Sequence, residues 1–150
     1  MKLNDKYKIG YTQGVFDMFH IGHLNLLRQA KELCDYLIVG VNSDKLVKCY
    51  KHKTPIINES ERAQIIDAIK YVDEVFIADT LDKVEIYKNH PFNAVFIGSD
   101  WLGNPRWEQT EKDLKREGGA EVVYLEYTKR ISSSGLSLIH DNRVHDRNED

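Results

Sequence analysis

The chain has 150 residues, of which 41% are hydrophobic and 30% are charged. This length suits one domain that buries roughly 70% of the surface of its unfolded chain, and the composition excludes a disordered or coiled-coil protein. The 21 basic and 24 acidic residues leave a formal net charge of −3. A general basic surface for nucleic acid or an anionic membrane is therefore excluded, and any polyanion must be bound by a local cluster.

Neither the cysteines nor the apolar segments point to a secreted or membrane protein. Cys34 and Cys49 are too few for the disulfide framework of a small secreted domain. Residues 1–6 lack the apolar core of a signal peptide, and no apolar run approaches the roughly 20 residues of a membrane span. We therefore expect a reduced, cytoplasmic protein with no membrane span and no nucleic-acid partner.

Strand-like and helix-like segments alternate through the first half of the chain. Short apolar, β-branched runs predict strands, and apolar residues at i, i+3 and i+4 spacing predict helices. We expect, in chain order, a strand over 8–13, a helix over 22–34, a central strand over 36–41 and a long loop over 42–58. Asn58 or Ser60 is expected to cap the next helix, whose buried face contains Ala63, Ile66 and Ile69.

The second half repeats the alternation. We expect strands over 74–78, 94–98 and 121–125, helices over 81–89 and 105–117, a short helix over 136–140 and a polar tail over 143–150. Strands that alternate with helices form parallel sheets with right-handed crossovers. The expected fold class is therefore α/β: a single Rossmann-like, doubly wound domain with a five-stranded parallel sheet over 1–135, followed by the short helix and tail over 136–150.

The ten residues after the first strand carry the candidate site. In a doubly wound sheet, ligands bind beyond the carboxyl ends of the strands, where the strand order reverses. The first strand is expected to end at Gln13, and the next residues read GVFDMFHIGH. Gly14 lets a ligand approach the backbone, and Gly22 opens a helix whose first turn is expected to offer free N–H groups to an anion. His20 and His23 stand three residues apart at this turn, so both imidazoles can face one bound phosphate.

This segment resembles the signature of the nucleotidyltransferase superfamily, in which a GxFD turn is followed by HxGH. Within it, the chain is similar to the cytidylyltransferases, most of all to the small glycerol-3-phosphate cytidylyltransferases. The similarity runs from the first strand to about Ser134. It includes further motifs: Glu61-Arg62, YVDEV at 71–75, FIGSDW at 96–101, and Thr128 with ISS at 131–133.

The resemblance implies that a phosphomonoester attacks the α-phosphate of CTP, which releases pyrophosphate and forms a CDP-alcohol. A phosphate dianion is already nucleophilic near pH 7, so the reaction needs positioning and charge neutralisation rather than a general base. Mg²⁺ is expected to enter with CTP, with Asp17 or Asp100 able to assist, and no separate metal site is expected. The implied partners are CTP, a small phosphorylated alcohol and a second copy of the chain, with 70–74 near the dimer contact.

The same resemblance implies a role for each matching residue. His20 and His23 would hydrogen-bond the triphosphate and stabilise charge on the transferred phosphoryl group, and Lys53 would contact the CTP phosphates as a third catalytic residue. Lys51 and Lys83 would contact the acceptor. The CTP-binding residues would be Gly14, Val15, Phe16, Asp17, Gly22, Lys70, Asp100, Thr128, Ile131, Ser132 and Ser133.

Several positions depart from the family pattern. Lys70 stands where arginine is common, Ser99 replaces the first of two adjacent acidic residues, and Tyr127 replaces an arginine of the last motif. An arginine occurs instead at Arg130, two residues before the serines at 132–134. We expect Arg130 to be a relocated catalytic guanidinium that binds phosphate. The alternatives are an ordinary exposed basic residue and a different acceptor.

Other functions stay open at this point. A related adenylyltransferase of the heptose-phosphate, flavin or pantetheine-phosphate type shares both the GxFD and HxGH motifs, and a non-catalytic nucleotide-binding protein can use the same fold. Single residues also have structural alternatives. A histidine at a helix start can be a simple cap, the lysines at 48–53 can belong to a solvated loop, and Trp101 can cover the base or fill the edge of the sheet.

Overall fold

Five strands alternate with helices over residues 6–126, which are the residues that the computed structural model describes. The strands are β1 (Tyr7–Gly14), β2 (Cys34–Asn42), β3 (Glu74–Ala78), β4 (Ala94–Gly98) and β5 (Glu121–Leu125). The last three have the bounds expected from the sequence. β1 and β2 are longer than expected, because Tyr7, Gly14, Cys34 and Asn42 at their ends still pair in the sheet.

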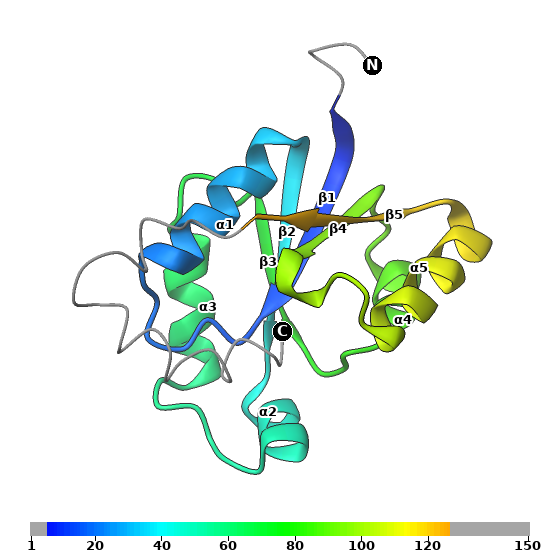
Figure 1. Ribbon diagram of the computed structural model, residues 1–150. Coiled ribbons are helices and arrows are strands. Elements are labelled where there is room, and N and C mark those ends of the chain that lie inside the picture. The colour runs from blue at the N-terminus through cyan, green and yellow to red at the C-terminus, as the bar shows by residue number, and fades with distance from the viewer. Residues whose placement is uncertain (1–5, 127–150) are drawn as a thin grey trace.

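All neighbouring strands are parallel, in the order β3-β2-β1-β4-β5 (Figure 1). The chain moves outward from β1 to β2 and β3, then crosses back to β4 on the other side of β1. The strand order therefore reverses between β1 and β4. This arrangement confirms the expected α/β class and the doubly wound, five-stranded parallel sheet.

The helices are α1 (Ile21–Glu32), α2 (Asp44–Lys51), α3 (Glu59–Asp67), α4 (Lys83–Asn89) and α5 (Pro105–Gly118), with a 3₁₀ turn η1 over Ser99–Trp101. Helix α2 corrects the expectation of a loop over 42–58. Ser43 caps it by accepting a hydrogen bond from the Leu46 N–H, and His52 ends it in the left-handed conformation. Its one buried residue is Val47, and its apolar residues Leu46, Val47 and Tyr50 span little more than one turn, so the run is too short to reveal a helical period in the sequence.

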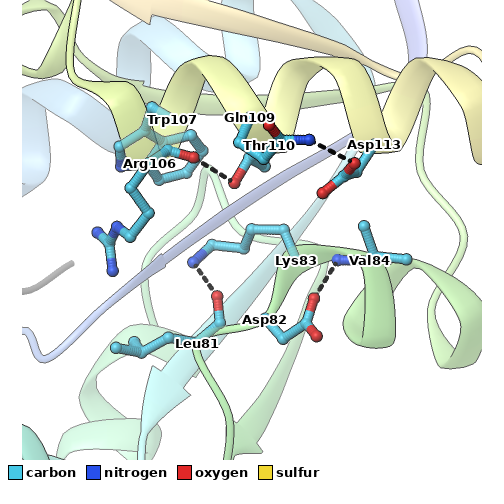
Figure 2. Close-up of a pocket in the computed structure, with 9 residues that line it drawn as sticks. All are labelled: Leu81, Asp82, Lys83, Val84, Arg106, Trp107, Gln109, Thr110 and Asp113. Atoms are coloured by element: carbon cyan, nitrogen blue, oxygen red, sulfur yellow. Dashed lines mark hydrogen bonds between the residues drawn. The ribbon is translucent and has the colours of Figure 1, made fainter.

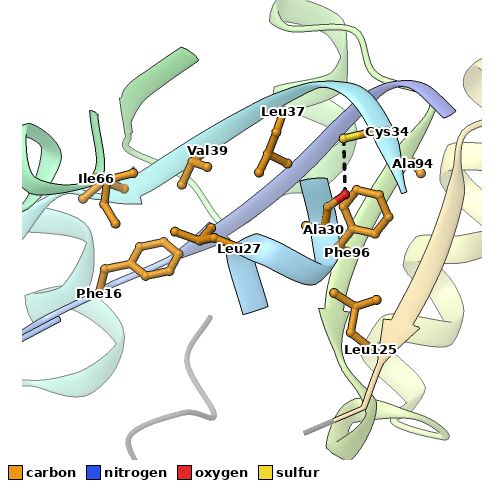
Figure 3. Packing of buried hydrophobic residues seen from close by; sticks show 11 residues of the cluster. Phe16, Leu27, Ala30, Cys34, Leu37, Val39, Ile66, Ala94, Phe96 and Leu125 are labelled. Atoms are coloured by element: carbon orange, nitrogen blue, oxygen red, sulfur yellow. Dashed lines mark hydrogen bonds between the residues drawn. The ribbon is translucent and has the colours of Figure 1, made fainter. Parts of the chain in front are cut away.

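Helices cover both faces of the sheet. Leu27 and Ala30 of α1 and Ile66 of α3 pack on one face, together with Leu37 and Phe96 of the strands (Figure 3). On the other face, Ile86 of α4 and Trp107 and Leu114 of α5 pack against a second apolar cluster from the same strands. The expected buried position of Ile66 is confirmed, while Ala63 and Ile69 are partly buried at the rim of the first cluster.

The two cysteines are free and lie in different environments. Cys34 starts β2, rather than ending α1 as expected, and its thiol donates a hydrogen bond to the Ala30 carbonyl oxygen. Burial raises the pKa of the Cys34 thiol to about 11, so this thiol stays protonated near neutral pH. Cys49 is exposed on α2.

The β1–β4 pair parts before the two strands end. Gly10 pairs with Ala94 and Tyr11 pairs with Val95, but the ladder stops there. One residue further along β1, the Thr12 hydroxyl donates a hydrogen bond of 3.0 Å to the Phe96 carbonyl oxygen in place of a backbone donor. The carboxyl ends of these strands therefore separate at the point where the strand order reverses, which is where a doubly wound sheet binds its ligand.

The close contact between Gly40 and Tyr11 gives a test of the packing between β2 and β1. A Cβ atom on Gly40 would overlap the Tyr11 hydroxyl, which donates a hydrogen bond to the Gln13 side chain. Gly40→Ala is therefore expected to lower the free energy of unfolding by about 2 kcal/mol. Adding Tyr11→Phe is expected to remove part of that loss, because the clashing oxygen is gone.

Urea unfolding of the parent, both single variants and the double variant measures this coupling. A double variant whose loss equals the sum of the two single losses would contradict the contact.

Candidate active site

The turn between β1 and α1 has a strained backbone. Phe16 and Met18 have φ angles of 55° and 49°, in the left-handed region that residues other than glycine rarely adopt. Each such residue costs about 1 kcal/mol or more and persists only where the surrounding structure holds it. Burial of the Phe16 side chain, which is 6% exposed, fixes one of the two. This turn carries four of the predicted site residues, so its shape matters to the site.

Arg62 on α3 binds the backbone of this turn. Its side chain is fully buried and donates four hydrogen bonds of 2.6–2.8 Å. Nη1 binds the carbonyl oxygens of Val15 and Asn42, Nε binds that of Ile57, and Nη2 binds the Asp44 carboxylate. A buried guanidinium satisfied in this way joins the strained turn, the end of β2 and the approach to α3.

Asp17 has a structural role that its sequence position did not show. Its two carboxylate oxygens accept hydrogen bonds from the backbone N–H groups of Ile56 and Ile57, at 2.8 and 3.0 Å. These bonds hold the segment after α2 against the turn that contains the histidines. The expectation that Asp17 contacts CTP or assists the metal is untested, but both of its oxygens already bind backbone donors.

The starts of α2 and α3 cap one another. The Asp44 N–H donates to the Glu59 carboxylate at 2.8 Å, and the Glu59 N–H donates to the Asp44 carboxylate at 3.2 Å. Asp44 also forms the ion pair with Arg62. Together with Asp17, this exchange holds the end of residues 51–58 that leads into α3. This segment carries Lys51 and Lys53.

His20 and His23 cap helix α1 through their Nδ1 atoms. His20 is the N-cap residue, and its Nδ1 accepts a hydrogen bond of 3.0 Å from the Gly22 N–H. Nδ1 of His23 accepts one of 3.1 Å from the His20 N–H. The rings are stacked with centroids 3.9 Å apart. The expectation that Gly22 offers a free N–H to an anion is therefore wrong, because that N–H is donated to His20.

This capping fixes the tautomer of both rings. An Nδ1 atom that accepts a backbone N–H carries no proton, so the proton of each neutral imidazole lies on Nε2. Phe16 and Phe19 lie against the His23 ring, with ring centroids 5.4 Å away in each case. The histidines therefore cap the helix, which was the structural alternative for them. They also present two Nε2–H donors beside the carboxyl end of β1.

Three of the four predicted lysines occupy two places. Lys51 and Lys53 follow β2, at the end of α2 and just after it, on the segment that Asp17 and Arg62 hold. Lys83 starts α4, after β3, and is only 4% exposed. Its ammonium donates to the Leu81 carbonyl oxygen at 2.9 Å and lies 5.1 Å from the centroid of the Trp107 ring.

Lys83 lines a pocket of about 470 Å³ between the first turns of α4 and α5 (Figure 2). The pocket is also lined by Leu81, Arg106, Trp107, Gln109 and Asp113. The Trp107 indole N–H is a buried polar group without a hydrogen-bond partner among residues 6–126, an arrangement that costs about 1–3 kcal/mol. The sequence did not indicate this pocket, because its walls come from two separate helices.

The remaining predicted residues are spread more widely. Asp100 is exposed in η1, directly after β4 and therefore at the same edge of the sheet as the histidines. Lys70 precedes β3, at the opposite edge, and its ammonium lies 5.4 Å from the Tyr71 ring centroid. The structure therefore does not bring Lys70 to the histidines within one chain. Predictions for Thr128, Arg130, Ile131, Ser132 and Ser133, and for the helix over 136–140, lie outside the described residues.

No group of three or more histidine, cysteine, aspartate or glutamate side chains gathers as a metal site within residues 6–126. In the same part of the chain, no helix has the length and apolar character needed to cross a membrane.

Arg62 gives a stability test of the site's frame. Arg62→Met is expected to lower the free energy of unfolding by about 3–5 kcal/mol, because it removes the ion pair of the Asp44 carboxylate and the hydrogen bonds that three carbonyl oxygens accept from the guanidinium. Arg28→Met is the matched control, since Arg28 forms an exposed pair with Glu32 at 3.5 Å, a kind of pair that contributes about 1 kcal/mol or less. Urea unfolding compares the two. Equal losses in both variants would remove Arg62 from this role.

Residues 11–137 match the cytidylyltransferase-like family. An FAD synthase of Thermococcus kodakarensis is 40% identical over 129 residues, which are 84% of this chain and 85% of that protein. The bifunctional protein HldE of Hyphomonas neptunium is 49% identical over 130 residues, 86% of this chain but 26% of HldE. A probable ethanolamine-phosphate cytidylyltransferase of Encephalitozoon cuniculi is 34% identical over 116 residues, 77% of this chain and 33% of that protein.

Solved structures agree on the fold. The lipopolysaccharide core biosynthesis protein from Thermoplasma volcanium superposes with a TM-score of 0.72 at 24% identity, over 81% of this chain and 98% of that one. The family match extends from within β1 past the last described strand, and the curated relatives align over most of the same span. The chain is therefore a nucleotidyltransferase and belongs to the cytidylyltransferase-like family.

Proposed function

We propose that the chain transfers a cytidylyl group from CTP to the phosphate of a phosphorylated alcohol. The observation that carries this proposal is the histidine pair, whose Nδ1 atoms both accept backbone N–H groups, so that each neutral ring carries its proton on Nε2. The two rings stack with centroids 3.9 Å apart, and the pair lies beside the point where β1 and β4 separate. Two neighbouring donors at this point suit a phosphate chain, which offers oxygen acceptors and negative charge.

The reaction needs no base from the protein. An oxygen of the acceptor phosphate forms a bond to the α-phosphorus of CTP, and the bond from that phosphorus to the bridging oxygen breaks, so pyrophosphate leaves with the electron pair. His20 and His23 donate hydrogen bonds from Nε2 to the phosphoryl oxygens as charge develops on them. Lys53 adds positive charge on the CTP phosphates, and Lys51 and Lys83 add it on the acceptor side.

Mg²⁺ enters with the nucleotide in this proposal. The triphosphate carries about four negative charges, and hard cations of this kind bind phosphate oxygens and water with only one or two protein carboxylates. The carboxylate of Asp17 already accepts hydrogen bonds from two backbone N–H groups. Of the two predicted metal-assisting residues, this leaves Asp100, which lies directly after β4. The metal neutralises phosphate charge when it is bound.

Adenylyl transfer is the second candidate. The FAD synthase of Thermococcus kodakarensis is 40% identical to this chain and aligns over most of both chains. That name fits the flavin type of adenylyltransferase, and the same histidine geometry serves ATP as well as CTP.

We also propose that the chain forms a homodimer whose contact lies near residues 70–74. These residues lead into β3, which is an edge strand, and Ile77 on β3 is 37% exposed.

A panel of nucleotides and acceptors tests the proposed function. Purified protein with Mg²⁺ is expected to release pyrophosphate from CTP in the presence of a phosphorylated polyol, and to do so at least tenfold faster than from ATP, GTP or UTP. Excess chelator is expected to abolish the release, because the nucleotide charge is then not neutralised. Preference for ATP with flavin mononucleotide would establish the second candidate instead, and no release from any pair would favour a nucleotide-binding protein without catalysis.

The two roles of the histidines separate in a second experiment. His20→Asn keeps an acceptor oxygen near the position of Nδ1 but loses the Nε2–H donor, whereas His20→Gln extends toward the position of Nε2 but loses the cap. His20→Asn is expected to lower kcat by about 10²-fold with the cap kept. His20→Gln keeps an amide donor near the position of Nε2, so it is expected to lose less activity but to lose the roughly 1 kcal/mol of an N-cap. Pyrophosphate release and thermal unfolding measure the two effects.

His90→Asn is the control, because His90 stacks on Phe76 at a centroid distance of 4.0 Å, away from the β1–α1 turn. A near-normal kcat for both His20 variants would return this residue to a purely structural cap.

A further inference from the structure

The pocket between α4 and α5 opens at the same edge of the sheet as the histidines. Lys83 and Leu81 belong to the connection from β3 to α4, and Arg106 and Trp107 belong to the first turn of α5, which follows β4 and η1. The segments that line the pocket therefore follow the carboxyl ends of β3 and β4. We expect the acceptor to reach the pocket from the histidine site along this edge of the sheet.

Donors for a ligand's oxygen atoms line one side of the pocket. Figure 2 shows the Lys83 ammonium and the Arg106 guanidinium extending toward the same space beside the Trp107 indole. Arg106 also lies over the Trp101 ring, 5.2 Å from its centroid. The buried Trp107 N–H has no partner among residues 6–126. A buried donor left in this state is satisfied when a ligand brings an acceptor to it.

Acceptors line the opposite side. The Asp113 carboxylate lies one helical turn and more beyond Trp107 on α5 and lines the same pocket. Hydrogen bonds from the Gln109 amide and the Arg116 guanidinium, at 2.9 and 2.8 Å, both fall on its Oδ1 atom. They hold the pKa of Asp113 below its ordinary value, so this group is an ionised acceptor at neutral pH.

Donors on one side and an acceptor on the other suit hydroxyl groups, each of which both donates and accepts. A planar ring fits less well, because the face of the Trp107 indole toward Lys83 is already covered by the ammonium at 5.1 Å. The volume of about 470 Å³ falls in the range of pockets that hold drug-sized ligands, roughly 300–1,000 Å³. A three-carbon phosphate leaves much of that space unfilled.

We propose that this pocket binds the carbon chain of the acceptor and selects a polyol or sugar phosphate with at least five carbons over glycerol 3-phosphate. The inference rests on the proposed function and names its acceptor class. Asp113, Arg106 and Trp107 are the residues that read the acceptor's hydroxyl groups, while the acceptor's phosphate stays at the histidine and lysine site.

Acceptor kinetics test the selection. With the nucleotide that supports turnover, kcat/KM is measured for glycerol 3-phosphate, ribitol 5-phosphate, a hexose 1-phosphate and flavin mononucleotide. A five-carbon or six-carbon acceptor is expected to exceed glycerol 3-phosphate by at least tenfold. Asp113→Asn and Trp107→Phe are expected to raise the KM for that acceptor at least fivefold, with the KM for the nucleotide unchanged. Glu117→Gln, an exposed carboxylate on α5 outside the pocket, is the matched control and is expected to change neither.

Tryptophan fluorescence makes the proposal testable even without turnover. The chain has two tryptophans, so Trp101→Phe leaves the pocket residue Trp107 as the reporter. Ribitol 5-phosphate is expected to quench it at concentrations where glycerol 3-phosphate does not, and Asp113→Asn is expected to weaken that binding at least fivefold.

Glycerol 3-phosphate or flavin mononucleotide as the best acceptor would overturn the proposal, as would pocket variants that affect all acceptors equally. Absence of turnover with every nucleotide would instead overturn the proposed function. In that case, unchanged fluorescence with ribitol 5-phosphate would overturn the pocket assignment as well.

Discussion

The buried guanidinium of Arg62 is the interaction on which the catalytic edge of the sheet depends. It binds three carbonyl oxygens and one carboxylate from three separate segments of the chain. Because a guanidinium is planar and its N–H directions are fixed, the three segments cannot shift independently. The strained turn with the histidines, the start of α2 and the approach to α3 therefore take their positions together.

Much of the fold was predictable, because the segments that define it differ sharply from their surroundings. β3, β4 and β5 are short apolar runs with polar residues on both sides, and α5 lies between Pro105 and the glycines at 118–119. Period and punctuation of this kind determine local structure directly. The histidines were predictable for a different reason, since two imidazoles and two glycines at fixed spacing after a strand form a motif with a chemical purpose.

The rest of the site depends on contacts that spacing does not encode. Helix α2 has eight residues and buries only Val47, so its apolar face is too short to stand out in the sequence. Asp17 and Arg62 act mostly on backbone N–H and carbonyl groups, which every residue possesses and which only the folded chain selects. The pocket that contains Lys83 is assembled from α4 and α5, and a charged residue that is 4% exposed gives no sign of its burial in the sequence.

The early parting of β1 and β4 also has a mechanical consequence. β1 and β2 share seven registered residue pairs, β2 and β3 share five, and β4 and β5 share five, but β1 and β4 share two. The β1–β4 pairing is thus the part of the sheet that bends most easily. A rotation about this pairing breaks few hydrogen bonds, and it moves the histidine turn on one half of the sheet relative to the α5 wall on the other. The sheet is therefore most flexible at the border between β1 and β4, where two substrates must be brought together and two products released.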